Sequence, residues 1–252
     1  MALKPVLEEV KENLQAIAAS HHLGDAAVRV TIGTLSVKQA IGNPSRQDFP
    51  LLQGKEVMIE AQFRGSYGQA FTDWPSYFNG SLNDVLSLSL NTNDNRALFI
   101  ATLNAVAAHL NLVNRTRHCH DEEPEECALQ IAQHILADSG KVKIGLIGLQ
   151  PAILENLVLT FGIDNVRCTD LNLKNIGTTK YRAEIWDGRT DTEKLIKWCN
   201  LVLATSSTII NNTFDEIREK AIAQGKRLII FGVTGAGVSA LVGLEMLCFQ
   251  PH

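Results

Sequence analysis

The stretch KVKIGLIGLQPAILENLVLTFGIDNVRCTD, residues 141–170, decides the predicted fold of this chain. Its first part, KVKIGLIG, is a short apolar run that is typical of a buried strand. Pro151 suits the first turn of a helix that runs to Phe161, and NVRCTD predicts a second strand that ends at Asp170. A strand, a helix and a strand in this order predict two parallel strands joined by a right-handed crossover.

The same alternation surrounds this stretch and continues toward the carboxyl terminus. A helix is predicted over residues 125–138, and later elements are predicted as a helix over 191–200, a strand over 201–206, a helix to about 225, a strand over 227–233 and a final helical stretch. Strands that alternate with helices predict a parallel sheet covered by helices. We therefore expect an α/β protein in which residues 125–252 form a Rossmann-like domain.

The amino-terminal half predicts a smaller α+β domain. Apolar residues at helical spacing predict a helix over residues 5–19, β-rich runs predict strands over 28–32 and 57–63, and two helices follow from residues 81 and 93. The pattern then changes at the polar segment NRTRHCHDEEP. The predicted organisation is a domain over residues 1–113, a linker over 114–124 and the Rossmann-like domain after it.

Composition narrows the class of protein. With 252 residues, of which 45% are hydrophobic and 20% charged, the chain is long enough for two domains and is expected to fold throughout. The net charge of −4 comes without a long Lys/Arg cluster, so no nucleic-acid partner is expected. No signal peptide or membrane-length apolar run is present, and the five scattered cysteines fit free thiols, so we expect a cytoplasmic protein without a membrane partner.

Polar residues follow the predicted parallel strands. In a doubly wound sheet the ligand crevice lies outside the carboxyl ends of the strands, and Rossmann proteins carry an acid near the position of Asp170 that accepts from ribose hydroxyls. Turn formation and helix capping are the alternative roles for these residue types. The turn GLIGLQP departs from G-x-G-x-x-G, which disfavours a bound dinucleotide. The candidate ligand-binding residues are Gly148, Asp170, Asn172, Ser206, Ser207, Thr208, Asn211 and Thr234.

A second candidate region is RGSYGQAFTDWPSYFNGSL, residues 64–82. Its glycines would let backbone N–H groups approach a ligand, while Arg64 could clamp an anion. The alternative is a β-hairpin turn with three aromatic side chains, Trp74, Tyr77 and Phe78, on the core. The candidate ligand-binding residues here are Arg64, Tyr67, Gly68, Gln69 and Thr72.

The linker holds the densest group of potential metal ligands. His118, Cys119, His120 and Cys127 offer imidazole and thiolate groups, which suit zinc or copper better than magnesium or calcium. A divalent metal ion is the cofactor that this interpretation implies. No C-x-x-C or H-x-x-x-H pair occurs, and acids around Pro124 would also suit the amino terminus of a helix.

The segments RGSYGQAFTD, NRALFIATLNAVAAHLN, HCHDEEPEEC and ATSSTIINNT together resemble a family of proteins labelled as heavy-metal chelation proteins, none with an assigned reaction. The resemblance implies a small domain similar to the amino-terminal domain of enolase, then a Rossmann-like domain, with a site in the cleft between them. We expect the 64–72 loop to face the strand ends, with Cys119 close by.

Two hypotheses about function remain open at this point. The chain binds a metal or a small molecule in the cleft, or it is an enzyme that acts there on a nucleotide-like or anionic small molecule. A non-catalytic scaffold is a third interpretation. The sequence is compatible with a homo-oligomer and leaves its oligomeric state open.

Overall fold

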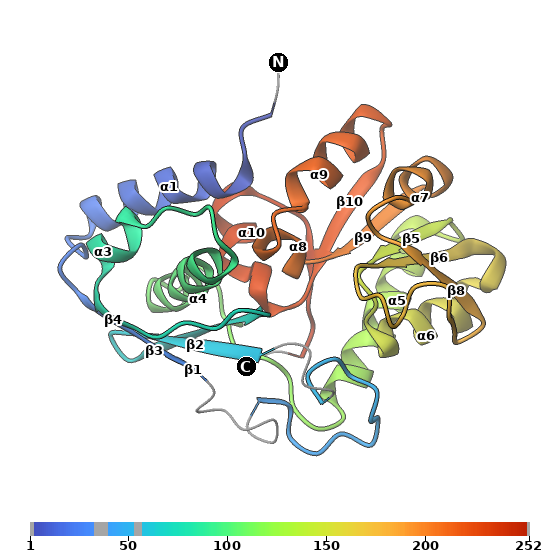
Figure 1. Cartoon of the computed structure of the whole chain (residues 1–252), viewed down its shortest axis with the longest axis horizontal. Coiled ribbons are helices and arrows are strands. Elements are labelled where there is room, and N and C mark those ends of the chain that lie inside the picture. Colours follow the sequence, from blue (N-terminus) through green and yellow to red (C-terminus); the bar gives the residue numbers. More distant parts are fainter. Residues whose placement is uncertain (1–2, 33–39, 53–56, 251–252) are drawn as a thin grey trace.

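The computed structural model describes residues 3–32, 40–52 and 57–250 and contains two sheets that lie side by side (Figure 1). The smaller sheet has four strands in the order β3-β2-β1-β4, and the larger has seven in the order β11-β10-β9-β5-β6-β8-β7. The predicted α/β class is therefore confirmed. No helix among the described residues has the length and apolar character needed to cross a membrane.

The smaller sheet is antiparallel and belongs to the amino-terminal half. Its strands are β1 (Ala27–Ile32), β2 (Val57–Phe63), β3 (Ser66–Thr72) and β4 (Phe78–Ser81). Its helices are α1 (Val6–Ser20), α3 (Leu82–Ser87) and α4 (Asn93–His109). Ser81 begins α3 with a capping box, because its hydroxyl accepts from Asp84 N and the Asp84 side chain accepts from Ser81 N.

Helix α4 packs directly on β3. A Cβ atom at Gly68 would lie 2.2 Å from Ala105 N, so the absence of a side chain lets the helix approach the strand this closely. Residues on nearly all sides of α4 are buried, because the helix also contacts α8 and α10 of the carboxyl-terminal half. Helix α4 thus serves as a core element for both halves.

The region predicted either as a ligand loop or as a hairpin turn is a hairpin that includes a full strand. Arg64 and Gly65 form the turn with φ of 46° and 86°, and β3 then pairs antiparallel with β2. The aromatic side chains differ from the expected packing, because Trp74 and Tyr77 are 69% and 70% exposed. Only Phe78 packs against the core.

The larger sheet carries the Rossmann-like arrangement. Strands β5 (Ile144–Ile147), β6 (Val166–Asp170), β8 (Ala183–Asp187), β9 (Leu201–Thr205), β10 (Arg227–Phe231) and β11 (Met246–Leu247) are parallel, and β7 (Thr179–Lys180) is antiparallel to β8. Helices α5 (Glu123–Ser139) and α6 (Pro151–Phe161) pack on one face. Helices α7 (Thr192–Trp198) and α9 (Phe214–Ala223) pack on the other.

The short helices α8 (Ser207–Ile210) and α10 (Ala236–Val242) follow β9 and β10. They lie between the two sheets, where Figure 1 shows them beside α4. Ile209, Ile210 and Val238 accordingly share one buried cluster with the core of the amino-terminal half. The hydrophobic core of the carboxyl-terminal half thus extends into the other half.

Residues of the amino-terminal half also pack into the core of the carboxyl-terminal half. Ile41, Phe49 and Leu51, which precede β2 in the chain, are buried against α5, α6 and the larger sheet. Arg46 pairs with Glu125 of α5 and Glu155 of α6, and these carboxylates raise the pKa of its guanidinium although burial opposes this. The predicted linker, residues 114–124, covers most of the irregular segment between α4 and α5, but its last two residues, Glu123 and Pro124, belong to α5. Division into independently folding domains stays a prediction.

Candidate functional site

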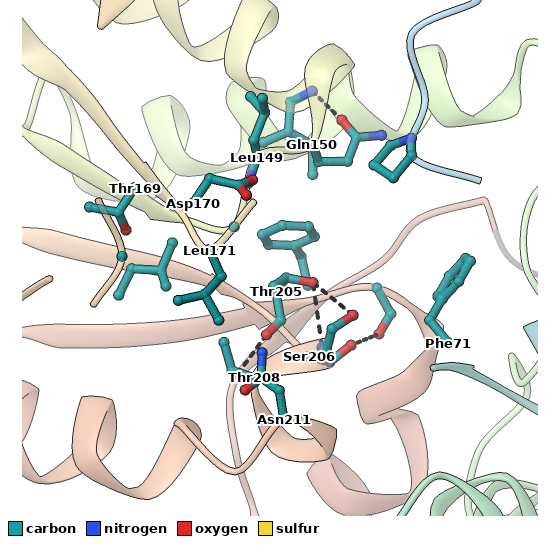
Figure 2. A pocket seen from close by; sticks show the side chains of 18 of the residues that line it. Phe71, Leu149, Gln150, Thr169, Asp170, Leu171, Thr205, Ser206, Thr208 and Asn211 are labelled. Carbon is teal, nitrogen blue, oxygen red and sulfur yellow. Dashed lines mark hydrogen bonds between the residues drawn. The ribbon is translucent and has the colours of Figure 1, made fainter. Parts of the chain in front are cut away.

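A cleft of about 1070 Å³ opens at the carboxyl edge of the larger sheet. Strand β5 lies between β6 and β9, and the chain moves outward from β5 in opposite directions toward β8 and toward β11. This reversal is the topological switch point at which open α/β sheets bind ligands. Figure 2 shows residues from several strand ends around the hollow, with Phe71 of β3 on a further side.

The first wall is the turn between β5 and α6. Gly148 has φ of +88°, and a Cβ atom there would lie 2.4 Å from the Thr205 side chain, so this turn requires glycine. Gln150 caps α6 with its own side chain, which accepts from Ile153 N at 2.6 Å. Leu149 and Gln150 stand at the position where a dinucleotide-binding turn has less bulky residues (Figure 2).

The second wall contains Asp170 at the end of β6. Leu149 N donates to Asp170 Oδ2 at 2.9 Å, and Asn172 N donates to Oδ1 at 2.6 Å. The carboxylate therefore ties the turn after β5 to the turn after β6, which is the structural role considered for it in the sequence. Each oxygen has a further lone pair, so Asp170 can also accept from a ligand in the cleft.

The third wall is the segment after β9. Ser206 Oγ donates to Gly232 O at 2.9 Å and Thr208 Oγ1 donates to Thr205 O at 2.6 Å, so both hydroxyls fix the chain. Asn211 accepts from the Thr213 hydroxyl at 2.7 Å and also borders the cleft. Within the described residues, the only hydrogen bond of the Ser207 hydroxyl is one that it accepts from Thr205 Oγ1 at 3.4 Å. Its proton can therefore bind a ligand.

Thr234 occupies a different place from the other predicted residues. Its buried hydroxyl accepts from Phe71 N at 3.1 Å, and it joins β3 to the segment after β10 instead of lining the cleft. The sequence analysis missed Asn104, whose side chain donates to Gln69 O at 2.8 Å and accepts from Gly237 N at 2.7 Å. These bonds hold the amino-terminal half against the cleft.

The amino-terminal half reaches the cleft through Phe71, Thr72 and Asp73. Arg64, Tyr67, Gly68 and Gln69 are not among the residues that line it. Tyr67 lies under the Arg117 guanidinium at 4.1 Å, and the buried Gln69 side chain donates to Glu60 at 2.9 Å and accepts from His118 N at 2.7 Å. Of the candidates chosen from this hairpin, only Thr72 borders the cleft.

Three thiols belong to another part of the cleft lining, called the thiol end: Cys119, Cys127 and Cys248. The nearby Cys248 thiol lowers the pKa of Cys127 to about 7, and Cys127 and burial raise the pKa of Cys248. Phe249 N, next to Cys248 in the chain, donates to Cys127 Sγ at 3.3 Å. Burial raises the pKa of Cys119. The sequence analysis did not select Cys248, because nothing in its spacing indicates that the fold brings it to Cys127.

The histidines of the linker take other roles. The Nδ1 atom of His118 lies 2.6 Å from Cys119 O, its ring meets Phe71 edge to face at 5.2 Å, and burial lowers its pKa to about 4. His120 donates its backbone N–H to Glu123 at 2.7 Å. Across the residues that the structure describes, no three His, Cys, Asp or Glu side chains are arranged to hold a metal ion. The predicted set of His118, Cys119, His120 and Cys127 is therefore not assembled around one point.

Comparison with known proteins finds a family model that matches part of the carboxyl-terminal half. Residues 131–244 match the model of the DUF364 family, described as "Putative heavy-metal chelation", which confirms the resemblance seen in the sequence. No curated protein matches the chain.

Two solved structures of DUF364 proteins of unknown function are similar to this chain. The one from Pyrococcus horikoshii has a TM-score of 0.52 at 15% identity and covers 92% of this chain and 80% of its own. The one from Desulfitobacterium hafniense DCB-2 has a TM-score of 0.49 at 11% identity, with 74% and 72% covered. At this identity the Pyrococcus structure supports the fold alone.

Proposed function

We propose, from the premise that residues 131–244 carry the DUF364 match, that this chain binds a small polar molecule with hydroxyl or anionic groups in its cleft. The observation that carries the proposal is the position of the cleft at the switch point between β5 and β9. Ligands of open α/β sheets bind at this position because the strand ends and helix starts expose polar groups there.

The walls define the kind of ligand. Asp170 offers acceptors for hydroxyl groups, and the Ser207 hydroxyl offers a donor on the opposite wall. Arg189 and Lys220 also line the cleft, and Lys220 is paired with Glu216 at 2.6 Å and Glu193 at 3.5 Å, two carboxylates that line it as well. This combination suits a sugar phosphate or a mononucleotide.

A dinucleotide fits this cleft less well. The turn Gly148–Pro151 has only one glycine, so the Leu149 and Gln150 side chains stand where a pyrophosphate would need close contact with backbone N–H groups. We therefore expect a mononucleotide or sugar phosphate to bind more tightly than a dinucleotide.

Titration calorimetry with adenosine monophosphate, ribose 5-phosphate and nicotinamide adenine dinucleotide tests the proposal. Ser207→Ala removes one donor without adding bulk and should weaken binding of the preferred ligand by about tenfold, in line with roughly 1–1.5 kcal/mol for one hydrogen bond. Ser20→Ala is the matched control, because the Ser20 hydroxyl is exposed and donates to Ile17 O at 3.0 Å within its own helix. Equal binding of the wild type and Ser207→Ala would count against the proposed cleft.

The enzyme alternative uses the same cleft. It predicts that a bound ligand changes its mass during incubation, whereas a binding protein returns it unchanged. Mass spectrometry of the ligand recovered after titration separates these two outcomes.

A further inference from the structure

The cleft has an apolar wall in addition to its strand ends. Residues 40–52, α5 and α6 each contribute side chains to the lining, and apart from the thiol of Cys127 all of these side chains are apolar. The residues that define this apolar wall are Ile41, Phe49, Leu51, Ala128, Ile131 and Ile153. All six are buried in one hydrophobic cluster, so the wall is a packed surface of fixed shape.

The charged side chains of residues 40–52 are engaged away from the cleft lining. Arg46 pairs with Glu125 of α5, with Glu155 of α6 and, at 3.5 Å, with Asp48 of its own segment. Neither Arg46 nor Asp48 lines the cleft. The segment therefore presents apolar side chains to the cleft, while its charged groups are paired with each other and with the two helices.

The apolar wall begins beside the strand ends. Gln150, in the turn after β5, accepts from Ile153 N at 2.6 Å, so a residue of the strand ends and a residue of the wall share one helical turn. The Phe71 ring lies at the border of the hollow in Figure 2 and packs against the cluster that contains the wall. One molecule can therefore contact both regions at once.

The cleft is larger than a small polar molecule needs. Its volume of about 1070 Å³ lies at the top of the range of roughly 300–1,000 Å³ that is typical of sites for drug-sized ligands. A polar group against the apolar wall would lose its hydrogen bonds to water without replacing them, whereas an apolar group gains free energy by leaving water. The space beside the wall thus favours an apolar part of the ligand.

Aromatic side chains favour a ring in this space. Phe49, Phe71 and Phe231 all line the cleft, and contacts between aromatic rings stabilise beyond the effect of the buried area. The His118 ring meets Phe71 edge to face at 5.2 Å, and burial lowers the pKa of His118 to about 4. This imidazole is therefore uncharged at neutral pH and adds no charge beside the wall.

We propose that the ligand of this cleft has two parts, a sugar phosphate that binds at the strand ends and an attached aromatic ring that lies against the apolar wall. The inference rests on the proposed function, because it takes the strand ends as the site of the polar part. Sugar phosphates that carry a ring, including mononucleotides, are the class bound, and sugar phosphates without a ring bind more weakly. The apolar wall offers no polar side chain to the ring, so the ring needs no hydrogen-bonding groups of its own.

Titration calorimetry of the wild type with a matched pair of ligands tests the inference. Phenyl β-D-glucopyranoside 6-phosphate and methyl β-D-glucopyranoside 6-phosphate share their polar part and differ only in the apolar group. At about pH 6 the Cys127 thiol, with its pKa of about 7, is mostly protonated. The phenyl glycoside should bind about 10- to 100-fold more tightly, as expected for burial of one aromatic side chain, and with a more negative heat-capacity change. Equal affinity of the two glycosides would overturn the inference.

A variant beside the wall locates the ring. Phe71→Ala should weaken binding of the phenyl glycoside about fivefold, because one aromatic contact is lost, and leave the methyl glycoside unchanged. Phe78→Ala is the matched control, since Phe78 packs on the core of the amino-terminal half and is not part of the cleft lining. Thermal melting establishes that both variants are folded at the temperature of the titration. Unchanged binding of the phenyl glycoside in folded Phe71→Ala would contradict the placement of the ring.

Ser207→Ala separates this inference from the proposed function. It should weaken binding of both glycosides by the same factor and leave the ratio of their affinities unchanged. Equal affinity of the two glycosides, with weaker binding of both in Ser207→Ala, would overturn the ring and support the proposed function. Tighter binding of the phenyl glycoside with no effect of Ser207→Ala would support the apolar wall and overturn the polar part at the strand ends. Binding of neither glycoside would overturn both.

Discussion

The two ends of the cleft are built in different ways. At the strand ends, Gly148, Asp170 and Ser207 each lie at or within two residues of the end of a parallel strand, so the topology of one sheet brings them together. At the thiol end, Phe249 N donates to Cys127 Sγ at 3.3 Å because the chain after the last strand returns beside α5. The comparison shows that a polar site at a sheet edge follows from local pattern, whereas a site built from distant segments depends on tertiary packing.

The largest expected effect concerns the turn at the strand ends. Gly148→Ala should reduce the free energy of unfolding by roughly 3 kcal/mol, since it combines backbone strain with overlap at the Thr205 side chain. Gly243→Ala is the control: Gly243 has φ of 67° and ψ of 30° with nothing within 4 Å of an added Cβ, so about 1–2 kcal/mol is expected. Urea denaturation measures both values, and equal losses would show that the contact with Thr205 is unimportant.

The segment next to the thiol end should respond to pH. Burial lowers the pKa of His118 to about 4, so the unfolded chain binds a proton between pH 6.5 and about 4 that the folded chain does not bind. The free energy of unfolding should therefore fall as the pH decreases through this window, by up to about 3 kcal/mol.

Denaturation of His118→Gln at a series of pH values checks the source of this dependence. The substitution should flatten the slope between pH 4 and 6.5, while His21→Gln on the exposed end of α1 should leave it unchanged. An unaltered slope in His118→Gln would assign the pH response to other groups.

A smaller effect is expected at Asp170. Asp170→Asn replaces one carboxylate oxygen, which accepts a hydrogen bond from a backbone N–H, by an amide NH₂ group that cannot accept it. The free energy of unfolding should therefore fall by about 1–3 kcal/mol. Asp84→Asn makes the same change at the start of α3, where the carboxylate accepts from Ser81 N at 2.8 Å away from the cleft lining. Both variants are compared by thermal melting and ligand titration. Only Asp170→Asn should weaken ligand binding, and equal binding in the two would remove Asp170 from the site.

The smallest effect is expected in the hairpin region. Trp74→Ser and Tyr77→Ser should each change the free energy of unfolding by less than about 0.5 kcal/mol, because both side chains are largely exposed. Phe78→Ser should cost more, since Phe78 packs against the core. A large decrease in the free energy of unfolding of Trp74→Ser would favour the interpretation in which the aromatic side chains pack on the core.

Elements with strong local signals could be predicted from the sequence, whereas short strands could not. Helix α6 begins at Pro151 and ends at Phe161 as predicted, because a proline start and an apolar face are local signals. Strands β7, β8 and β11 were not predicted, since two of them have only two residues and β8 alternates polar and apolar residues in a short run. Their existence depends on pairing with neighbours in the sheet.

The same distinction applies to the site. Residues near the ends of predicted strands could be selected from the sequence. Those that line the cleft are Gly148, Asp170, Asn172, Ser206, Ser207, Thr208 and Asn211. The hairpin candidates could not be separated by pattern, because alternation along β3 leaves only its last residues at the cleft. Whether these residues bind a ligand stays a prediction.

Native mass spectrometry of the untagged protein with adenosine monophosphate tests the central claim, that the cleft at the strand ends binds a small polar molecule. The account predicts that the wild type carries one molecule of the nucleotide. Ser207→Leu, which fills the strand-end wall, should lose it, whereas Ser20→Leu on the exposed end of α1 should keep it. Equal nucleotide binding in the wild type and Ser207→Leu would contradict the account.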